Sequence, residues 1–84
     1  MPKPREILAK VTSKKGQIRF RDFQKLLAAL GFRLDRIRGS HHIYVNPKVT
    51  RVFSVQPVGS EAKPFQVRQL RDMIVEFDLK LDKE

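Results

Sequence analysis

The chain has 84 residues, no cysteine and a formal net charge of +9. A chain of this length forms one small domain with a modest core, so it has no room for a separate cofactor domain. The lack of cysteine excludes a disulfide framework and cysteine-ligated zinc, and no apolar run approaches the ~18 residues of a membrane span. We therefore expect a soluble, cytoplasmic protein that uses no cofactor and contacts no membrane.

The positive charge is distributed unevenly along the chain. Residues 1–60 contain 13 Lys and Arg against three acids, whereas residues 61–84 contain five Lys and Arg against six acids. This asymmetry favours a polyanionic partner, most often nucleic acid, and the frequent arginines around Gly39 strengthen that interpretation. The alternative is that the excess of basic residues only keeps the protein in solution.

Three segments repeat apolar residues at the spacing of a helix. The first covers residues 4–13. The second, 20–30, is the most regular and is followed by Gly31, which suits a left-handed C-terminal cap. The third begins at Pro64 and extends to about residue 78.

The segment between the second and third helices predicts a three-stranded antiparallel meander. Its strands are expected at 33–38, 41–45 and 51–56, with a tight turn at Gly39-Ser40 and a polar loop over 58–63. The order α-α-β-β-β-α predicts a two-layer α+β domain with helices on one face of the sheet. In the first strand Leu34, Arg36 and Arg38 stand at alternate positions, so a regular strand would point all three side chains to the same face. Only part of this strand can therefore face the core, or the strand is short.

His41 and His42 are adjacent at the start of the second strand. Neighbouring strand residues point to opposite faces, and no Cys, Asp or Glu nearby completes a ligand set, so we expect no metal site. The sequence also lacks a glycine-rich phosphate loop and a Gly-x-Ser-x-Gly motif.

Histidine is the side chain whose ordinary pKa lies near neutrality, so it suits proton transfer on RNA, which supplies its own 2′-hydroxyl nucleophile. Arg36, Arg38, Gly39 and Ser40 precede His41 and could hold a phosphate. Two alternatives stay open. The histidine could be half-buried and have only a structural role, and the charged first strand, Arg33 included, could be a solvent-exposed edge strand.

Beyond composition, the chain resembles a known family in an ordered set of motifs. They are a helix ending in Leu-Gly-Phe, an Arg-x-x-Gly-Ser-His segment, an aromatic residue (Tyr44) three positions after that histidine, a third strand and a Lys-Pro helix start. The set covers residues 20–77 and is similar to the HicA family, the toxins of HicA–HicB toxin–antitoxin pairs.

This resemblance implies a double-stranded-RNA-binding-domain-like fold and metal-independent cleavage of mRNA, neutralised by a HicB-type antitoxin. It assigns the functional histidine to His41, directly after Gly-Ser, and places His42 at a permissive position. The surrounding residues expected to contact RNA are Arg33, Arg36, Arg38, Gly39, Ser40 and His42.

The chain departs from the family pattern in two places. Residues 1–18 are an N-terminal extension ahead of a HicA-like domain at 19–84. Where many members end the third strand in Pro-Val-His-Gly, this chain has "QPVGS" without a histidine, so a second acid or base must come from a lysine, His42 or water. A non-catalytic RNA-binding module and a small interaction protein with incidental charge are the alternative functions.

Overall fold

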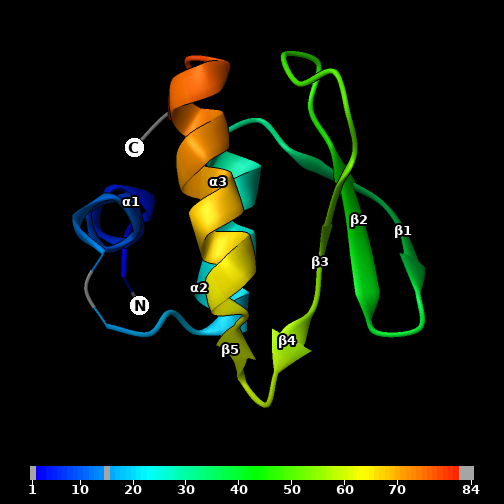
Figure 1. Cartoon of the computed structure of the whole chain (residues 1–84), viewed down its shortest axis with the longest axis horizontal. Helices are drawn as coiled ribbons and strands as arrows, with labels where there is room; N and C mark the ends of the chain where they lie inside the picture. The colour runs from blue at the N-terminus through cyan, green and yellow to red at the C-terminus, as the bar shows by residue number, and fades with distance from the viewer. Residues whose placement is uncertain (1, 15, 82–84) are drawn as a thin grey trace.

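The computed structural model describes residues 2–14 and 16–81. Within these residues the chain forms three helices and five short strands (Figure 1). The elements are α1 (Pro4–Ser13), α2 (Phe20–Ala29), β1 (Arg33–Arg38), β2 (His41–Val45), β3 (Phe53–Val55), β4 (Pro57–Val58), β5 (Glu61–Ala62) and α3 (Pro64–Glu76). None of these helices combines the length and apolar character that a bilayer crossing requires.

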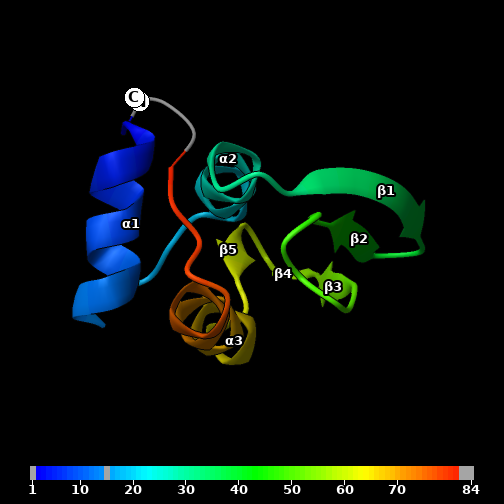
Figure 2. The ribbon, with the colours of Figure 1, turned by 90° about the horizontal axis from the view of Figure 1, so that it is seen from above.

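The elements form layers around one apolar core. Figure 2 shows α2 and α3 between the β1–β2–β3 sheet on one side and α1 on the other. The predicted α+β fold, with helices on one face of a three-stranded antiparallel sheet, is therefore confirmed. Helix α1 is also packed into the fold, since Ile7 and Val11 are buried in the same core as Phe23 and Leu70.

The end of α2 sets the path into the sheet. Gly31 has a φ of +97°, and the amides of Gly31 and Phe32 donate to the carbonyls of Ala28 and Leu27, at 3.1 and 2.9 Å. This is the bond pattern of a Schellman cap, as the Leu-Gly-Phe sequence predicts. The buried Asn46 side chain then donates to the Leu30 carbonyl at 3.1 Å, so the end of β2 is tied to the end of α2.

A β-bulge in β1 resolves the conflict in its side-chain pattern. Leu34 lies opposite Tyr44 and Arg36 opposite Ile43, so Asp35 is an extra residue between two consecutive pairs. The bulge shifts the alternation by one residue, and Leu34 and Arg36 therefore lie on opposite faces of the sheet. The pairing register of β1 against β2 decides this arrangement, and the alternation of residues in the sequence alone does not reveal it.

Two expectations about the segment after β2 were wrong. The third strand covers only Phe53–Val55 and not 51–56. The expected polar loop over 58–63 instead takes part in a hairpin, β4–β5, in which Pro57 lies opposite Ala62 and Val58 opposite Glu61. This hairpin forms because the chain at residues 18–20 acts as its neighbour: the Ala62 amide donates to the Ile18 carbonyl at 2.8 Å, and the Phe20 amide donates to the Ser60 carbonyl at 2.9 Å.

Candidate functional site

The turn between β1 and β2 is a two-residue β-hairpin loop. Gly39 has a φ of +62°, and Ser40 is not among the residues with positive φ, which is the pattern of a type II′ turn with glycine first. Any other residue at position 39 would be strained, although a Cβ there would meet no atom within 4 Å. The glycine is therefore required by the backbone, and the space beside it is open.

His41 lies on the outer face of the sheet, away from the helices. It is exposed, and its partner across the ladder is Arg38. Its Nδ1 lies 3.3 Å from the Ser54 hydroxyl on β3. Within the described residues its Nε2 makes no hydrogen bond, so one ring nitrogen is held while the other is available to a ligand.

His42 lies on the opposite face, toward the helices. Its ring is half-buried and meets the Phe20 ring edge to face, with centroids 5.1 Å apart. Its Nδ1 is 3.2 Å from the Ser40 carbonyl. The two adjacent imidazoles therefore have different surroundings, as alternation along a strand predicts.

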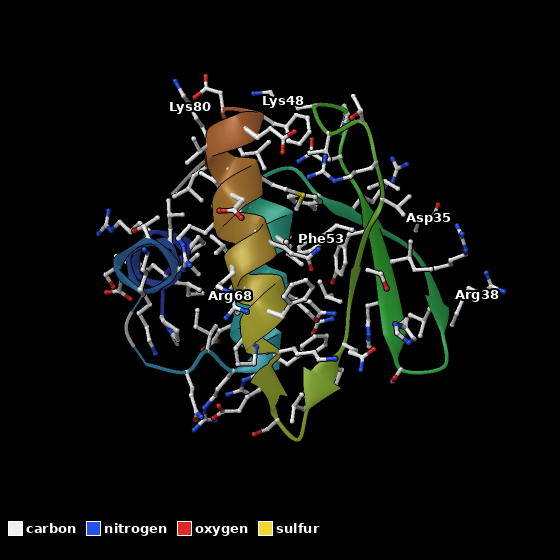
Figure 3. The ribbon with its side chains drawn as sticks, in the orientation of Figure 1. Asp35, Arg38, Lys48, Phe53, Arg68 and Lys80 are labelled. Carbon is white, nitrogen blue, oxygen red and sulfur yellow. The ribbon has the colours of Figure 1, made fainter. Side chains whose placement is uncertain are left out.

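The bulge at Asp35 gathers the arginines of β1 on the outer face. Arg33, Arg36 and Arg38 lie opposite Val45, Ile43 and His41, and residues paired across a ladder share a face. Without the extra residue, position 33 would have faced the other way. Figure 3 shows Arg38 extending away from the molecule at the outer end of β1.

The cations on this face are only partly neutralised. Arg36 forms an ion pair with Asp35, while Arg33 and Arg38 have no carboxylate partner among the described residues. The outer face thus combines an accessible imidazole with guanidinium groups, an arrangement suited to binding a phosphate and moving a proton beside it.

Strand β4 carries the Pro-Val that precedes the missing histidine, and Gly59 follows Val58 directly. Residues 57–58 are Pro57 and Val58, and they pair with β5 outside the three-stranded sheet. Within residues 2–14 and 16–81, no cluster of three or more His, Cys, Asp or Glu side chains could hold a metal ion. The acid–base chemistry available on the outer face therefore comes from one imidazole.

Sequence reasoning did not identify Ser54 as a partner of His41. The signal was present in β3, where buried Phe53 and Val55 flank a polar residue that must point outward. The register of β3 against β2, Ile43 opposite Ser54, was needed to bring that hydroxyl to the histidine. The contact of Phe20 with His42 was also missed, because it joins a helix start to a strand.

A protein-family model matches the part of the chain that includes these residues. The model described as the HicA toxin of bacterial toxin-antitoxin matches residues 20–75, which is two thirds of the 84-residue chain. Neither a curated protein nor a solved structure matches the chain. The match begins at α2 and leaves α1 outside it, but it contains the whole Gly39–Ser54 site. The chain therefore belongs to the HicA family of toxins of bacterial toxin–antitoxin systems.

Proposed function

We propose that this toxin is a metal-independent endoribonuclease that cleaves mRNA in the cytoplasm and uses His41 as its acid–base group. The observation that carries the proposal is the exposed His41 ring on the outer face, opposite Arg38 and hydrogen-bonded to Ser54 at one nitrogen only. A general base must reach its substrate with a free ring nitrogen, and this ring meets that condition.

In the proposed reaction His41 takes the proton of an RNA 2′-hydroxyl while the 2′-oxygen attacks the adjacent phosphorus. The bond to the 5′-oxygen breaks, leaving a 2′,3′-cyclic phosphate. Water protonates the departing oxygen, and the hydroxide so formed takes the proton back from His41. Arg36, Arg38 and the Ser40 hydroxyl bind the phosphate oxygens, and the open turn at Gly39 lets the backbone approach. Arg33 is predicted to make a further RNA contact on the outer face. His42 lies on the opposite face against Phe20, so its predicted contact with RNA requires the RNA strand to pass around the Gly39-Ser40 turn.

The protein that neutralises this toxin is proposed to be a HicB-type antitoxin that covers the outer face. Covering the face with acidic groups would place carboxylates against Arg33 and Arg38, which have no carboxylate partner within the described residues. Such a complex would block access of RNA to His41.

The test is cleavage of end-labelled RNA in excess EDTA. His41→Ala is expected to lower the cleavage rate by about 10²–10⁴-fold while the protein stays folded, because the ring is exposed. It should also abolish growth arrest in cells. His42→Ala changes the imidazole on the opposite face, against Phe20, and is expected to retain cleavage at saturating RNA. Full toxicity and cleavage by the His41→Ala protein would contradict the proposal.

A non-catalytic RNA-binding module is the second candidate, and one observation favours it. The outer face has no second imidazole to protonate the leaving oxygen, since the chain has only two histidines and His42 lies on the other face. This candidate predicts that RNA binds without being cut in EDTA and that His41→Ala changes nothing beyond affinity. The same assay separates the two functions.

A further inference from the structure

Residues of α1 and of the first half of α3 line a groove. Figure 2 shows α1 on the side of the molecule away from the β1–β2–β3 sheet. Its volume is about 680 Å³. The floor is apolar and consists of side chains from four segments: Val11, Ile18, Ala62, Pro64 and Val67. Helix α1 lies outside residues 20–75, which match the HicA family model, so one wall of this groove comes from a segment outside that match.

The walls of the groove are tied together by hydrogen bonds. The Arg71 guanidinium on α3 donates to the Val11 carbonyl on α1 at 3.2 Å, and Lys10 Nζ donates to the Gln17 carbonyl at 3.0 Å. Ile18 and Ala62 are buried and joined through their backbones at 2.8 Å. The groove is therefore formed before any ligand binds, which lowers the entropic cost of binding.

The rim of the groove is strongly basic. Lys10, Lys14, Arg68 and Arg71 line it against one acid, Glu61. None of these four cations forms an ion pair with a carboxylate of the described residues, and the Gln17 amide lies against the Glu61 carboxylate. The rim thus has positive charge available to an acidic ligand.

The side chains on the floor of the groove favour a protein ligand over RNA. No aromatic side chain lines the groove, whereas surfaces that bind single-stranded RNA stack its bases on aromatic rings. Aliphatic side chains and a proline suit the apolar anchors of an amphipathic segment instead. An apolar floor inside a basic rim therefore complements a polypeptide that alternates apolar and acidic residues.

We propose that the α1–α3 groove binds an acidic amphipathic segment of a partner protein. An apolar anchor of that segment sits on Val11, Ile18 and Val67, and its carboxylates bind Lys14 and Arg68. The site is separate from the outer face of the sheet. The proposal does not depend on the ribonuclease activity, and a partner held here could remain bound whether or not RNA occupies the His41 face.

The test is an NMR titration of the ¹⁵N-labelled full chain with a short synthetic peptide carrying Leu and Glu at helical spacing. The same peptide with Lys in place of Glu is the control ligand, and oligouridylate is the RNA control. We expect saturable shifts of the Val11, Ile18, Ala62 and Val67 amides with the acidic peptide alone. The double variant Lys14→Glu/Arg68→Glu should weaken binding at least about tenfold.

A matched double variant, Lys48→Glu/Lys80→Glu, makes the same charge change far from the groove, at the positions labelled in Figure 3. It should change the affinity for the peptide by less than about twofold. The proposal is overturned if the acidic peptide produces no saturable shifts or perturbs residues 36–43 instead. It is also overturned if the two double variants weaken binding equally, or if the lysine peptide or oligouridylate binds the groove as well as the acidic peptide. RNA cleavage is not a readout, so failure of the ribonuclease proposal would leave this result unchanged.

Discussion

Two hairpins of this toxin turn through the same dipeptide but carry different chemistry. In β1–β2 the turn is Gly39-Ser40, and in β4–β5 it is Gly59-Ser60; the glycine φ values are +62° and +63°. A Cβ at either glycine would meet no atom within 4 Å. As pieces of backbone, the two turns have the same glycine requirement.

The residues that flank the turns are what differ. Arg38 faces His41 across the first turn, whereas Val58 faces Glu61 across the second. The first pair lies on an open sheet face. The second hairpin is held by the chain at 18–20, through the Arg19–Glu61 bridge and the bond from the Phe20 amide to the Ser60 carbonyl. A Gly-Ser turn therefore supplies a conformation, and its flanks and neighbours decide whether it carries chemistry.

The comparison of the two hairpins predicts its largest effect for removal of the cation beside His41. Arg38→Ala is expected to weaken RNA binding by about tenfold, because a charge-assisted contact to phosphate is lost. The slope of log affinity against log salt should also fall by about one. Filter binding across a salt series measures both, with Lys80→Ala as the control for a charge lost elsewhere on the surface. Equal effects of the two substitutions would show that Arg38 contributes only overall charge.

The second prediction compares the turns directly. Gly39→Ala and Gly59→Ala should each lower the free energy of unfolding by about 1–2 kcal/mol, since both impose a left-handed φ on alanine. Urea denaturation measures this loss. RNA cleavage under folded conditions should fall about fivefold for Gly39→Ala alone, because a displaced turn moves His41 from its position. Equal loss of cleavage in both variants would indicate a general stability effect.

The smallest expected effect is at the hydroxyl that holds the His41 ring. Ser54→Ala should lower kcat about threefold, with KM unchanged, because an exposed hydrogen bond contributes little and acts through ring orientation. Ser54→Thr keeps the hydroxyl and should restore kcat. A rise in KM at constant kcat would instead assign Ser54 to RNA binding.

The bounds of the helices could be predicted from the sequence to within about two residues, because apolar periodicity and the residues that begin and end a helix are local signals. Pro64 begins α3, and Gly31 ends α2 in the cap that its Leu-Gly-Phe sequence predicts. The Gly39 turn and the strand carrying His41 were also predictable, since the glycine and the β-branched residues around Tyr44 act locally.

The parts that could not be predicted depend on neighbours distant in sequence. Strands β4 and β5 have two residues each, and their hairpin is supported by the backbone at 18–20. The bulge at Asp35 has no composition signal, and the hydrogen bond between Ser54 and His41 joins residues 13 positions apart through the β2–β3 register.

The amino-acid order alone thus specified three amphipathic helices, a glycine turn before an imidazole and an excess of positive charge, all set by short-range sterics and side-chain chemistry. The tertiary structure decided which face each charged group occupies. It brought Arg33 onto the same sheet face as Arg36, Arg38 and His41 through the Asp35 bulge, turned His42 toward Phe20, and closed α1 against α3 to form a basic groove. Those outcomes depend on strand register and helix docking, which are fixed only when the whole apolar core is buried together.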